Sequence, residues 1–384
     1  MEIYKRDAVI SPIILSVIGM SGFLILPLII GAAANSLHFD EQQLGWMASI
    51  IMFAAALSSI FAIVWIRKIN WQLAGYVALS VMCFSYVAAF FIHHQIFFVL
   101  LIASAAFGGG TLYSIALTVL SDSKHTDRNF GFSIAAQVSF QVLSLMILPM
   151  FIQQHGINSL IVLFLILVIV GLTLVRWIPI GGVKSIKNEP SKNNVTDVKH
   201  VLSAILTPKI IFALLGCFMF FMNVGVIWTY IERMGNNEGF SAENIGLALS
   251  IGVFFGIPGA LLASWVGERF DCIRSLALGA IVTVISVYML LESMTFVDYI
   301  IALALYNLAW NFSLTFQYAV VNKVDTSGVV VAAAPAFHAT GAAAGPVIAV
   351  LYVTSSSFVA VNTLAICSVI ISFLFFAIAT YLDK

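Results

Sequence analysis

Charged residues are scarce in this sequence: only 9% of its 384 residues are Asp, Glu, Lys or Arg, whereas 61% are hydrophobic. A soluble domain carries roughly 25% charged residues, which keep its surface wetted. Most of this chain's surface must therefore face something other than water, and the mean hydropathy of +1.07 points to lipid. The formal net charge is zero, so no basic field attracts nucleic acid and we expect none as a partner.

Signatures of several other protein classes are missing as well. The four cysteines are scattered, which is neither a disulfide framework nor a zinc pattern. The sequence has no Gly-rich phosphate loop ending in Lys-Ser/Thr, which disfavours ATP-driven transport. It also has no filter-like run and no charged ring, which disfavours a channel. We therefore expect no metal and no cofactor. No small-residue cleavage site follows the N-terminal MEIYKRD, which predicts a retained first helix.

Long apolar runs dominate what is present. A helix needs about 20 apolar residues to cross the roughly 30 Å hydrocarbon core of a bilayer, and β-barrel strands would alternate in polarity instead. We predict an all-α membrane protein with twelve transmembrane helices. Runs without Asp, Glu, Lys or Arg lie at 8–31, 44–66, 72–92, 95–121, 129–153, 156–175, 210–231, 244–267, 275–291, 299–322, 328–353 and 357–382.

The basic residues indicate how these spans are oriented. With the N-terminus in the cytoplasm and the loops assigned alternately, all 17 Lys and Arg residues except Arg233 fall on the inner side. Lys and Arg concentrate on the cytoplasmic side of membrane proteins. We therefore predict a multi-pass protein of the cell inner (plasma) membrane with both termini in the cytoplasm. We also expect the protein to be a monomer.

The spans divide into two groups of six. A polar, lysine-containing interruption at 179–208 is predicted to be a cytoplasmic linker between six-helix bundles at 1–178 and 209–384. A short pattern supports the division, because Phe39, Gly45, Ser49 and Ile50 recur 201 positions later as Phe240, Gly246, Ser250 and Ile251. Two parallel six-helix repeats around a midplane site are a known transporter plan, so we expect two pseudo-symmetric bundles.

Two loops carry a resemblance to a known family. WVGERFDCIR at 265–274 resembles a degenerate form of the loop signature of the major facilitator superfamily, with Glu268 as its acid and Arg269 as its arginine. WIRKINWQ, its counterpart in the first half, keeps Arg67 and Lys68 but has lost the acid and the glycines. The resemblance implies that these four residues act in gating on the inner side.

A third segment, GAAAGPVIAVL at 341–351, is similar to the Gly-Pro helix-packing stretch of the same superfamily. The resemblance covers essentially the whole chain and implies alternating access, in which two bundles rock around a central site. The run at 129–153 departs from it, because it lacks the Gly-Pro motif usual in the fifth span of drug–proton antiporters. A multidrug or toxicant exporter is therefore the second candidate rather than the first.

His338 is the only Asp, Glu, Lys, Arg or His residue inside any of the twelve runs. At 1.5 Å per residue it lies about 15 Å from the cytoplasmic start of its helix, near mid-depth. Ionisable residues at such depth mark functional sites, and an imidazole titrates near physiological pH. We predict that His338 carries a proton or bonds the substrate. The alternative is a neutral imidazole bonded to a neighbouring hydroxyl or carbonyl.

Polar and aromatic side chains gather in three spans, and in hydrocarbon they should face a partner or a wet cavity. In the run at 299–322, Tyr306 with Trp310, and Asn307 with Asn311, share helix faces at i, i+4 spacing. The alternative is bonding between packed helices, which Asn and Gln often provide. The predicted substrate-binding residues are Gln137, Gln141, Asn223, Trp228, Tyr230, Tyr306, Asn307, Trp310, Asn311 and Gln317.

Glu232 and Arg233 are adjacent at the predicted outer end of the seventh span. Two interpretations are open for this pair. It forms an outer gate or attracts the substrate, or it is a solvated helix end.

These features together predict a secondary transporter, not an enzyme, for a small, uncharged or weakly charged organic solute, coupled to protons. A strongly charged substrate normally meets a buried counter-charge, and only His338 is able to supply one. An intramembrane enzyme needs several reactive side chains placed together. His338 has no carboxylate partner within the runs, so it does not form such a group. The alternative from another class is a transport-silent membrane receptor or scaffold.

Overall fold

The computed structural model describes residues 7–123, 125–181, 207–267, 269–291, 294–325, 334–354 and 357–383. Within these ranges the chain is helical, and the only β pairing is an isolated bridge between Thr354 and Ser357. The predicted all-α architecture is confirmed. The chain divides into two compact units, a first of Met1–Phe39 and Ile50–Glu189 and a second of Asp40–Ser49 and Pro190–Lys384. The limits predicted for the linker stay a prediction, since most of it lies outside the described residues.

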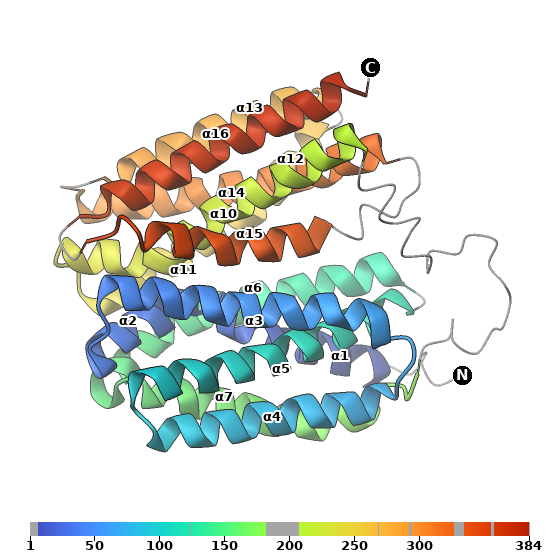
Figure 1. Ribbon diagram of the computed structural model, residues 1–384, viewed down its shortest axis with the longest axis vertical. Coiled ribbons are helices and arrows are strands. Elements are labelled where there is room, and N and C mark those ends of the chain that lie inside the picture. Colours follow the sequence, from blue (N-terminus) through green and yellow to red (C-terminus); the bar gives the residue numbers. More distant parts are fainter. Residues whose placement is uncertain are drawn as a thin grey trace, which may run out of the picture. The chain divides into compact units, whose positions relative to one another are not determined.

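The first unit is coloured blue to green in Figure 1. In it α5 packs against α1 and α4, α6 packs against α1, and α7 packs against α4. Its helices are α1 (Asp7–Leu24), α2 (Leu26–Leu37), α3 (Glu41–Trp65) apart from its first turns, α4 (Trp71–Phe91), α5 (Gln95–Ser121), α6 (Thr126–His155), α7 (Asn158–Leu174) and the short 3-10 helix η2 (Val175–Trp177).

The second unit follows from yellow-green to red (Figure 1). Here α10 lies against both α15 and α16, while α14 packs against α11, α12 and α13. Its helices are α10 (Pro208–Asn237), α11 (Ala242–Phe254), α12 (Gly256–Gly267), α13 (Cys272–Met289), α14 (Phe296–Val324), α15 (Ala334–Ala349) and α16 (Val359–Tyr381), together with the first turns of α3.

Two prolines explain why two of the predicted runs are each built from two helices. α1 and α2 meet at a bend of 47°, and Pro27 lies in the first turn of α2. Proline has no N–H to donate and its ring clashes with the preceding turn, which breaks a helix. Pro258, two residues into α12, likewise interrupts the helix bonds, and α11 ends just before α12 begins. The interruption is mild, because α11 and α12 together form one span, Ala242–Gly267.

Ten helical spans in the described part of the chain are long and apolar enough to cross a membrane, and the bent pair α1–α2 raises the number to eleven. α15 is a shorter apolar helix, and its predicted run begins at 328, in residues that are not described. Each of the twelve predicted runs therefore contains an apolar helix or helix pair. Twelve crossings remain a prediction.

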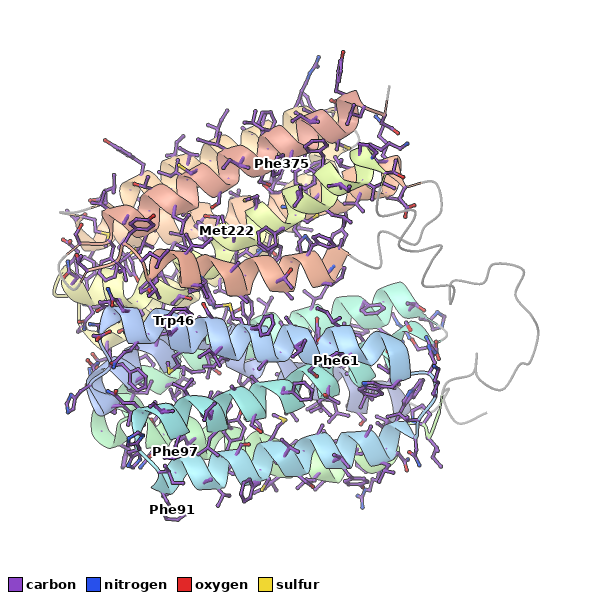
Figure 2. All side chains as sticks on the ribbon, in the orientation of Figure 1. Trp46, Phe61, Phe91, Phe97, Met222 and Phe375 are labelled. Atoms are coloured by element: carbon purple, nitrogen blue, oxygen red, sulfur yellow. The ribbon has the colours of Figure 1, made fainter. Side chains whose placement is uncertain are left out.

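Large apolar side chains cover the surface of both units. Phe91 and Phe84 of α4 are 75% and 73% exposed, and Leu261 of α12 is 66% exposed. Figure 2 shows Phe61, Phe91 and Phe97 projecting from helices of the first unit. Exposed apolar surface on this scale is unfavourable in water and marks contact with membrane or protein. Together with the apolar spans, it makes the chain a multi-pass membrane protein.

Glycines bring α1 and α5 into backbone contact. A Cβ added to Gly19 would lie 2.7 Å from the carbonyl oxygen of Gly109, and one added to Gly109 would lie 2.8 Å from that of Gly19. Real Cβ atoms do not approach backbone this closely, so the two helices pack this tightly only with glycine at both positions. The Gly-rich segment at 108–110 therefore serves helix packing.

We expect Gly19→Ala to lower the free energy of unfolding by about 1–3 kcal/mol, because the added methyl group overpacks the contact with α5. Gly22→Ala is the matched control in the same helix, since nothing lies within 4 Å of a Cβ there. It is expected to be neutral or to stabilise by up to about 1 kcal/mol, as alanine is the better helix former. Thermal unfolding in detergent measures both, and equal losses would contradict the packing role.

α15 packs against α10 in the same way. Gly341 and Gly345 face the backbone carbonyls of Phe218 and Met222, and Gly225 of α10 faces the carbonyl of Ala342. The helix-packing role implied for the segment at 341–351 is confirmed. The close approach also sets the position of His338, which lies one turn before Gly341 on α15 and whose ring contacts Phe221 of α10.

Candidate functional site

An aromatic cluster forms in the second unit where α10 and α14 meet. The ring of Trp310 lies 6.2 Å from that of Phe221, 6.3 Å from that of Trp228 and 6.5 Å from that of Tyr306, centroid to centroid. All three contacts are edge-to-face, the favoured geometry for aromatic pairs. Tyr306 and Trp310 meet because they lie at i, i+4 on α14. These four residues are called the aromatic cluster below.

His338 reaches this cluster from α15. Its ring stacks on Phe221 with a centroid distance of 4.1 Å and an interplanar angle of 22°. Its Nδ1 lies 3.5 Å from the hydroxyl oxygen of Tyr318, at the outer limit of a hydrogen bond. The side chain is 5% exposed, and Nε2 has no partner among the described residues. One ring nitrogen is thus available to a solute atom or a proton.

Two buried amide side chains accompany the rings. Asn223 is 1% exposed, and its backbone carbonyl accepts the hydroxyl of Tyr306 at 3.5 Å. Gln317 follows Trp310 by seven residues on the same face of α14 and is fully buried. Neither amide atom of Gln317 has a partner within the described ranges. Buried amides are almost always bonded, so Gln317 has unused donor and acceptor capacity.

The structure separates Asn307 and Asn311 from the aromatic cluster. Each donates its amide nitrogen at 3.0 Å to a carbonyl of its own helix, that of Leu303 and that of Asn307 respectively. A Cβ placed on Gly252 of α11 would lie 3.2 Å from the amide nitrogen of Asn307. This stripe therefore faces α11 and the start of α12, which corresponds to the packing interpretation and not to a binding face.

Tyr230 also lies apart from the cluster. Its hydroxyl donates to the backbone carbonyl of Glu41 at 3.1 Å, and its ring lies 6.0 Å from that of Phe358. These contacts connect the end of α10 to the first turn of α3 and to the start of α16. Tyr230 therefore does not belong to the aromatic cluster, although it was predicted to bind the substrate.

The two glutamines of α6 form contacts within the first unit. Nε2 of Gln137 lies 3.1 Å from Oγ of Ser133 and 3.4 Å from Oγ of Ser16 on α1, and the two hydroxyl oxygens are 2.6 Å apart. Gln141 donates to the carbonyl of Leu24 at 2.9 Å. That carbonyl stands at the break between α1 and α2, where the regular helix bonds end. Both side chains therefore tie α6 to α1.

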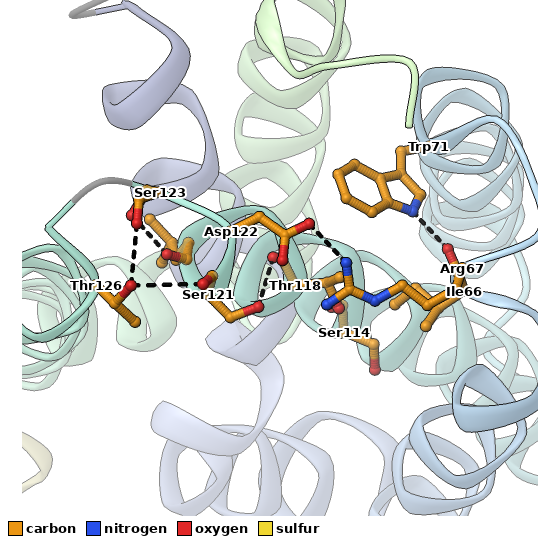
Figure 3. A network of polar contacts seen from close by, with 10 residues as sticks. Ile66, Arg67, Trp71, Ser114, Thr118, Ser121, Asp122, Ser123 and Thr126 are labelled. Carbon is orange, nitrogen blue, oxygen red and sulfur yellow. Dashed lines mark hydrogen bonds and ion pairs between the residues drawn. The ribbon is translucent and has the colours of Figure 1, made fainter. Parts of the chain in front are cut away.

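Arg67 has a partner that the sequence did not reveal (Figure 3). Its Nη1 lies 2.6 Å from Oδ2 of Asp122, just after the end of α5, and its guanidinium lies 5.9 Å from the ring centre of Trp71. The indole of Trp71 donates to the carbonyl of Ile66 at 2.5 Å. The α3–α4 connection is thus fixed to α5. Lys68, its predicted companion, is exposed.

This pair should respond unequally to loss of each partner. The carboxylate of Asp122 is buried, whereas the side chain of Arg67 is 39% exposed. Arg67→Ala leaves a buried charge without its cation and should cost about 1–3 kcal/mol of unfolding free energy. Asp122→Asn leaves an arginine that water still solvates, so it should cost less. Thermal unfolding of the two variants checks this order, and a larger loss in Asp122→Asn would refute it.

The signature at the end of α12 is only partly described. Glu268 lies outside the described residues. The guanidinium of Arg269 stacks 4.3 Å above the ring centre of Trp265, and its Nη1 donates to the carbonyl of Trp265 at 2.8 Å. Arg269 therefore covers the last turn of α12, where a cation is favourable.

The interpretation of Glu232 and Arg233 as a solvated helix end is wrong for Glu232, which is only 6% exposed. Arg233 forms its ion pair with Glu41 at 2.9 Å, not with its neighbour. Sequence reasoning missed Glu41, as it missed Asp122, because both lie at helix ends, where acids are usually solvated. A partner distant in sequence leaves no local signal.

Comparison with known proteins identifies the family. The model of the Major Facilitator Superfamily matches residues 13–346. The chain belongs to this superfamily of transporters. No curated protein sequence matches it significantly.

Solved structures show the same fold. The nucleoside transporter NupG is 12% identical with a TM-score of 0.79 over 97% of this chain and 99% of that one. The xylose transporter XylE from E. coli is 13% identical with a TM-score of 0.72 over 96% and 94%. A structure described for proton dependent oligopeptide transporters is 13% identical with a TM-score of 0.70 over 98% of each chain. At such identities the likeness concerns the fold alone.

Proposed function

We propose that this chain is a secondary active transporter that moves a small, uncharged or weakly charged organic solute across the cell inner (plasma) membrane by alternating access, coupled to protons. The aromatic cluster with His338 beside it is the observation that carries the proposal. The runs that supply these residues, 210–231, 299–322 and 328–353, contain no Asp, Glu, Lys or Arg. A solute with a strong net charge would find no opposite fixed charge there.

The chemistry of the site favours a solute with a flat or apolar face and a few polar groups. Trp310 and Phe221 are half-buried and offer ring surface, and stacking of a flat group such as a nucleobase on an aromatic side chain contributes about 1–3 kcal/mol. Nε2 of His338 and the amide of Gln317 offer hydrogen bonds to the polar groups. Pockets that combine apolar walls with few polar groups are typical for small organic ligands.

The structural relatives are consistent with this class of solute. Their descriptions name a nucleoside, xylose and oligopeptides as what those proteins transport. All are organic solutes, and two descriptions, of a D-xylose-proton symporter and of proton dependent oligopeptide transporters, name the proton as well. In this chain His338 is the proposed proton carrier, since its imidazole is the ionisable group beside the rings.

The aromatic cluster also supports a second candidate function, export of apolar toxicants by the same fold. A drug-susceptibility panel on a strain that lacks the protein separates the two. Increased sensitivity to several unrelated compounds supports export, whereas unchanged sensitivity with loss of growth on one nutrient supports import.

Reporter fusions at both ends test the proposed cytoplasmic termini, and light scattering of the purified protein tests the proposed monomer.

A stability screen followed by transport tests the leading proposal. The purified protein is heated with a library of metabolites and drugs, because a bound ligand raises stability by its binding free energy. Each hit is then offered to proteoliposomes under an imposed proton gradient. Accumulation of a neutral or weakly charged hit supports the proposal. Hits that bind without any movement, with or without the gradient, would contradict transport.

A further inference from the structure

The first turns of α3 are anchored to α10. Oε1 of Glu41 accepts Nε of Arg233 at 3.0 Å and Nη2 at 2.9 Å, and the backbone carbonyl of Glu41 accepts the hydroxyl of Tyr230. Gly45, one turn further on, makes room for Tyr230, whose hydroxyl a Cβ there would strike. Glu41, Tyr230 and Arg233 are called the α3 anchor. It lies within the second unit, whereas α3 continues from Ile50 into the first.

A second carboxylate lies beside this anchor. Glu232 is 94% buried, being 6% exposed, and its Oε2 has no hydrogen-bonding partner among the described residues. Arg233, the adjacent residue, directs its third donor, Nη1, to Oδ1 of Asn236 at 3.3 Å. The described charged or titratable groups that act on Glu232 are Arg233 on α10, Glu41 on α3 and Tyr299 on α14.

The surroundings of Glu232 suit a neutral carboxyl group better than an anion. A buried anion is costly unless a cation or several donors satisfy it. Tyr299 does not supply a donor, because its hydroxyl is bonded to the carbonyl of Ile231 at 2.8 Å. Arg233 is committed to Glu41. Two carboxylates thus compete for one guanidinium, and the observed pairing is the one expected when Glu232 carries a proton.

We propose that Glu232 is a proton-binding site that controls the α3 anchor. While Glu232 is protonated, Arg233 stays on Glu41 and the start of α3 is held on α10. When Glu232 loses its proton, the new anion draws Arg233 toward itself, and the hold on Glu41 weakens. A rising pH therefore loosens the start of α3 and a falling pH tightens it. The proposal goes beyond the proposed function, since it depends on neither the solute nor His338.

Spin labels on either side of the anchor test this directly. Gln42 and Asn237 are both exposed. The substitutions Gln42→Cys and Asn237→Cys provide the labelling positions, after the native cysteines Cys83, Cys217, Cys272 and Cys367 are replaced by serine. The full-length protein is then labelled in lipid nanodiscs. Pulsed EPR should show one short distance at low pH and a longer population that grows as the pH rises. The ratio of the two populations should change by up to about tenfold per pH unit, the limit for a single proton.

Three variants decide the outcome. Glu232→Gln is unable to lose a proton and should keep the short distance at every pH. Glu41→Gln should show the longer population even at low pH, and Glu243→Gln, an exposed acid at the start of α11, should behave as the unmodified protein does. The proposal is overturned if the parent protein shows no pH response, or if Glu232→Gln responds as the parent does. Since no transport is measured, failure here is distinct from failure of the proposed function.

Discussion

Replacing Trp310 by alanine is expected to weaken solute binding by roughly ten- to a hundredfold. Trp310 is the one ring that contacts all three other members of the aromatic cluster, so its loss removes a stacking surface and loosens the remaining rings. Stacking of a flat group such as a nucleobase on an aromatic side chain contributes about 1–3 kcal/mol, and each 1.4 kcal/mol corresponds to about a tenfold change in affinity. Calorimetric titration of a ligand from the stability screen measures the effect, and uptake into proteoliposomes should fall with it.

Two further variants separate binding from folding. Trp310→Phe keeps an aromatic surface and should retain most of the affinity. Trp177→Ala removes a tryptophan of η2 that is 46% exposed and belongs to the first unit, so affinity should not change. If Trp310→Ala and Trp177→Ala bind equally well, the aromatic cluster is not the binding site. Thermal unfolding of the free proteins shows whether a lost signal reflects lost structure.

The helices of this fold follow from the sequence for a simple physical reason. In hydrocarbon no water satisfies the backbone, so each apolar run must satisfy its own N–H and C=O groups as a helix. Charge-free runs therefore mark the helices well, with soft ends. The prediction was less exact at Pro27 and Pro258, where one run became two helices. Prolines are visible in the sequence, and their effect on a long span depends on whether neighbouring helices compensate for the missing bond.

The functional site was only partly predictable. Spacing of i, i+4 on α14 shows which residues share a stripe, such as Tyr306 with Trp310 and Asn307 with Asn311, and the structure agrees. Spacing does not show which neighbouring helix each stripe faces. The first stripe meets Phe221 and Trp228 of α10, whereas the second faces α11. That outcome depends on how the helices pack, which for α10 and α15 is set by small residues rather than by polar ones.

Ion pairs were harder still to predict. Arg67 and Asp122 are 55 residues apart, and Glu41 and Arg233 are 192 apart. Each charge by itself looks like a solvated helix end, and only the folded chain reveals that one member of each pair is buried. The information on these pairs resides in the tertiary structure. Because the chain has so few charged residues, a buried charged side chain is easily recognised in the structure.

His338→Gln is expected to abolish proton-driven accumulation of the solute while downhill exchange continues. Glutamine keeps hydrogen-bonding groups at the position but binds no proton at physiological pH. One proton that moves with the solute supplies about 2.3 kcal/mol per 100 mV of membrane potential, which corresponds to accumulation of roughly fiftyfold. In proteoliposomes the variant should reach only equal concentrations inside and outside, and its counterflow exchange should stay close to that of the parent protein.

The same experiment distinguishes the two interpretations of this histidine. Tyr318→Phe removes the hydroxyl near Nδ1 but keeps the aromatic ring. If His338 carries the proton, accumulation depends on the imidazole and should survive the loss of that hydroxyl. If His338 is instead a neutral structural imidazole held by Tyr318, both variants should lose stability and neither should lose accumulation. Fiftyfold accumulation by His338→Gln would assign proton coupling to another group, and a buried carboxyl group such as that of Glu232 would then be the next to test.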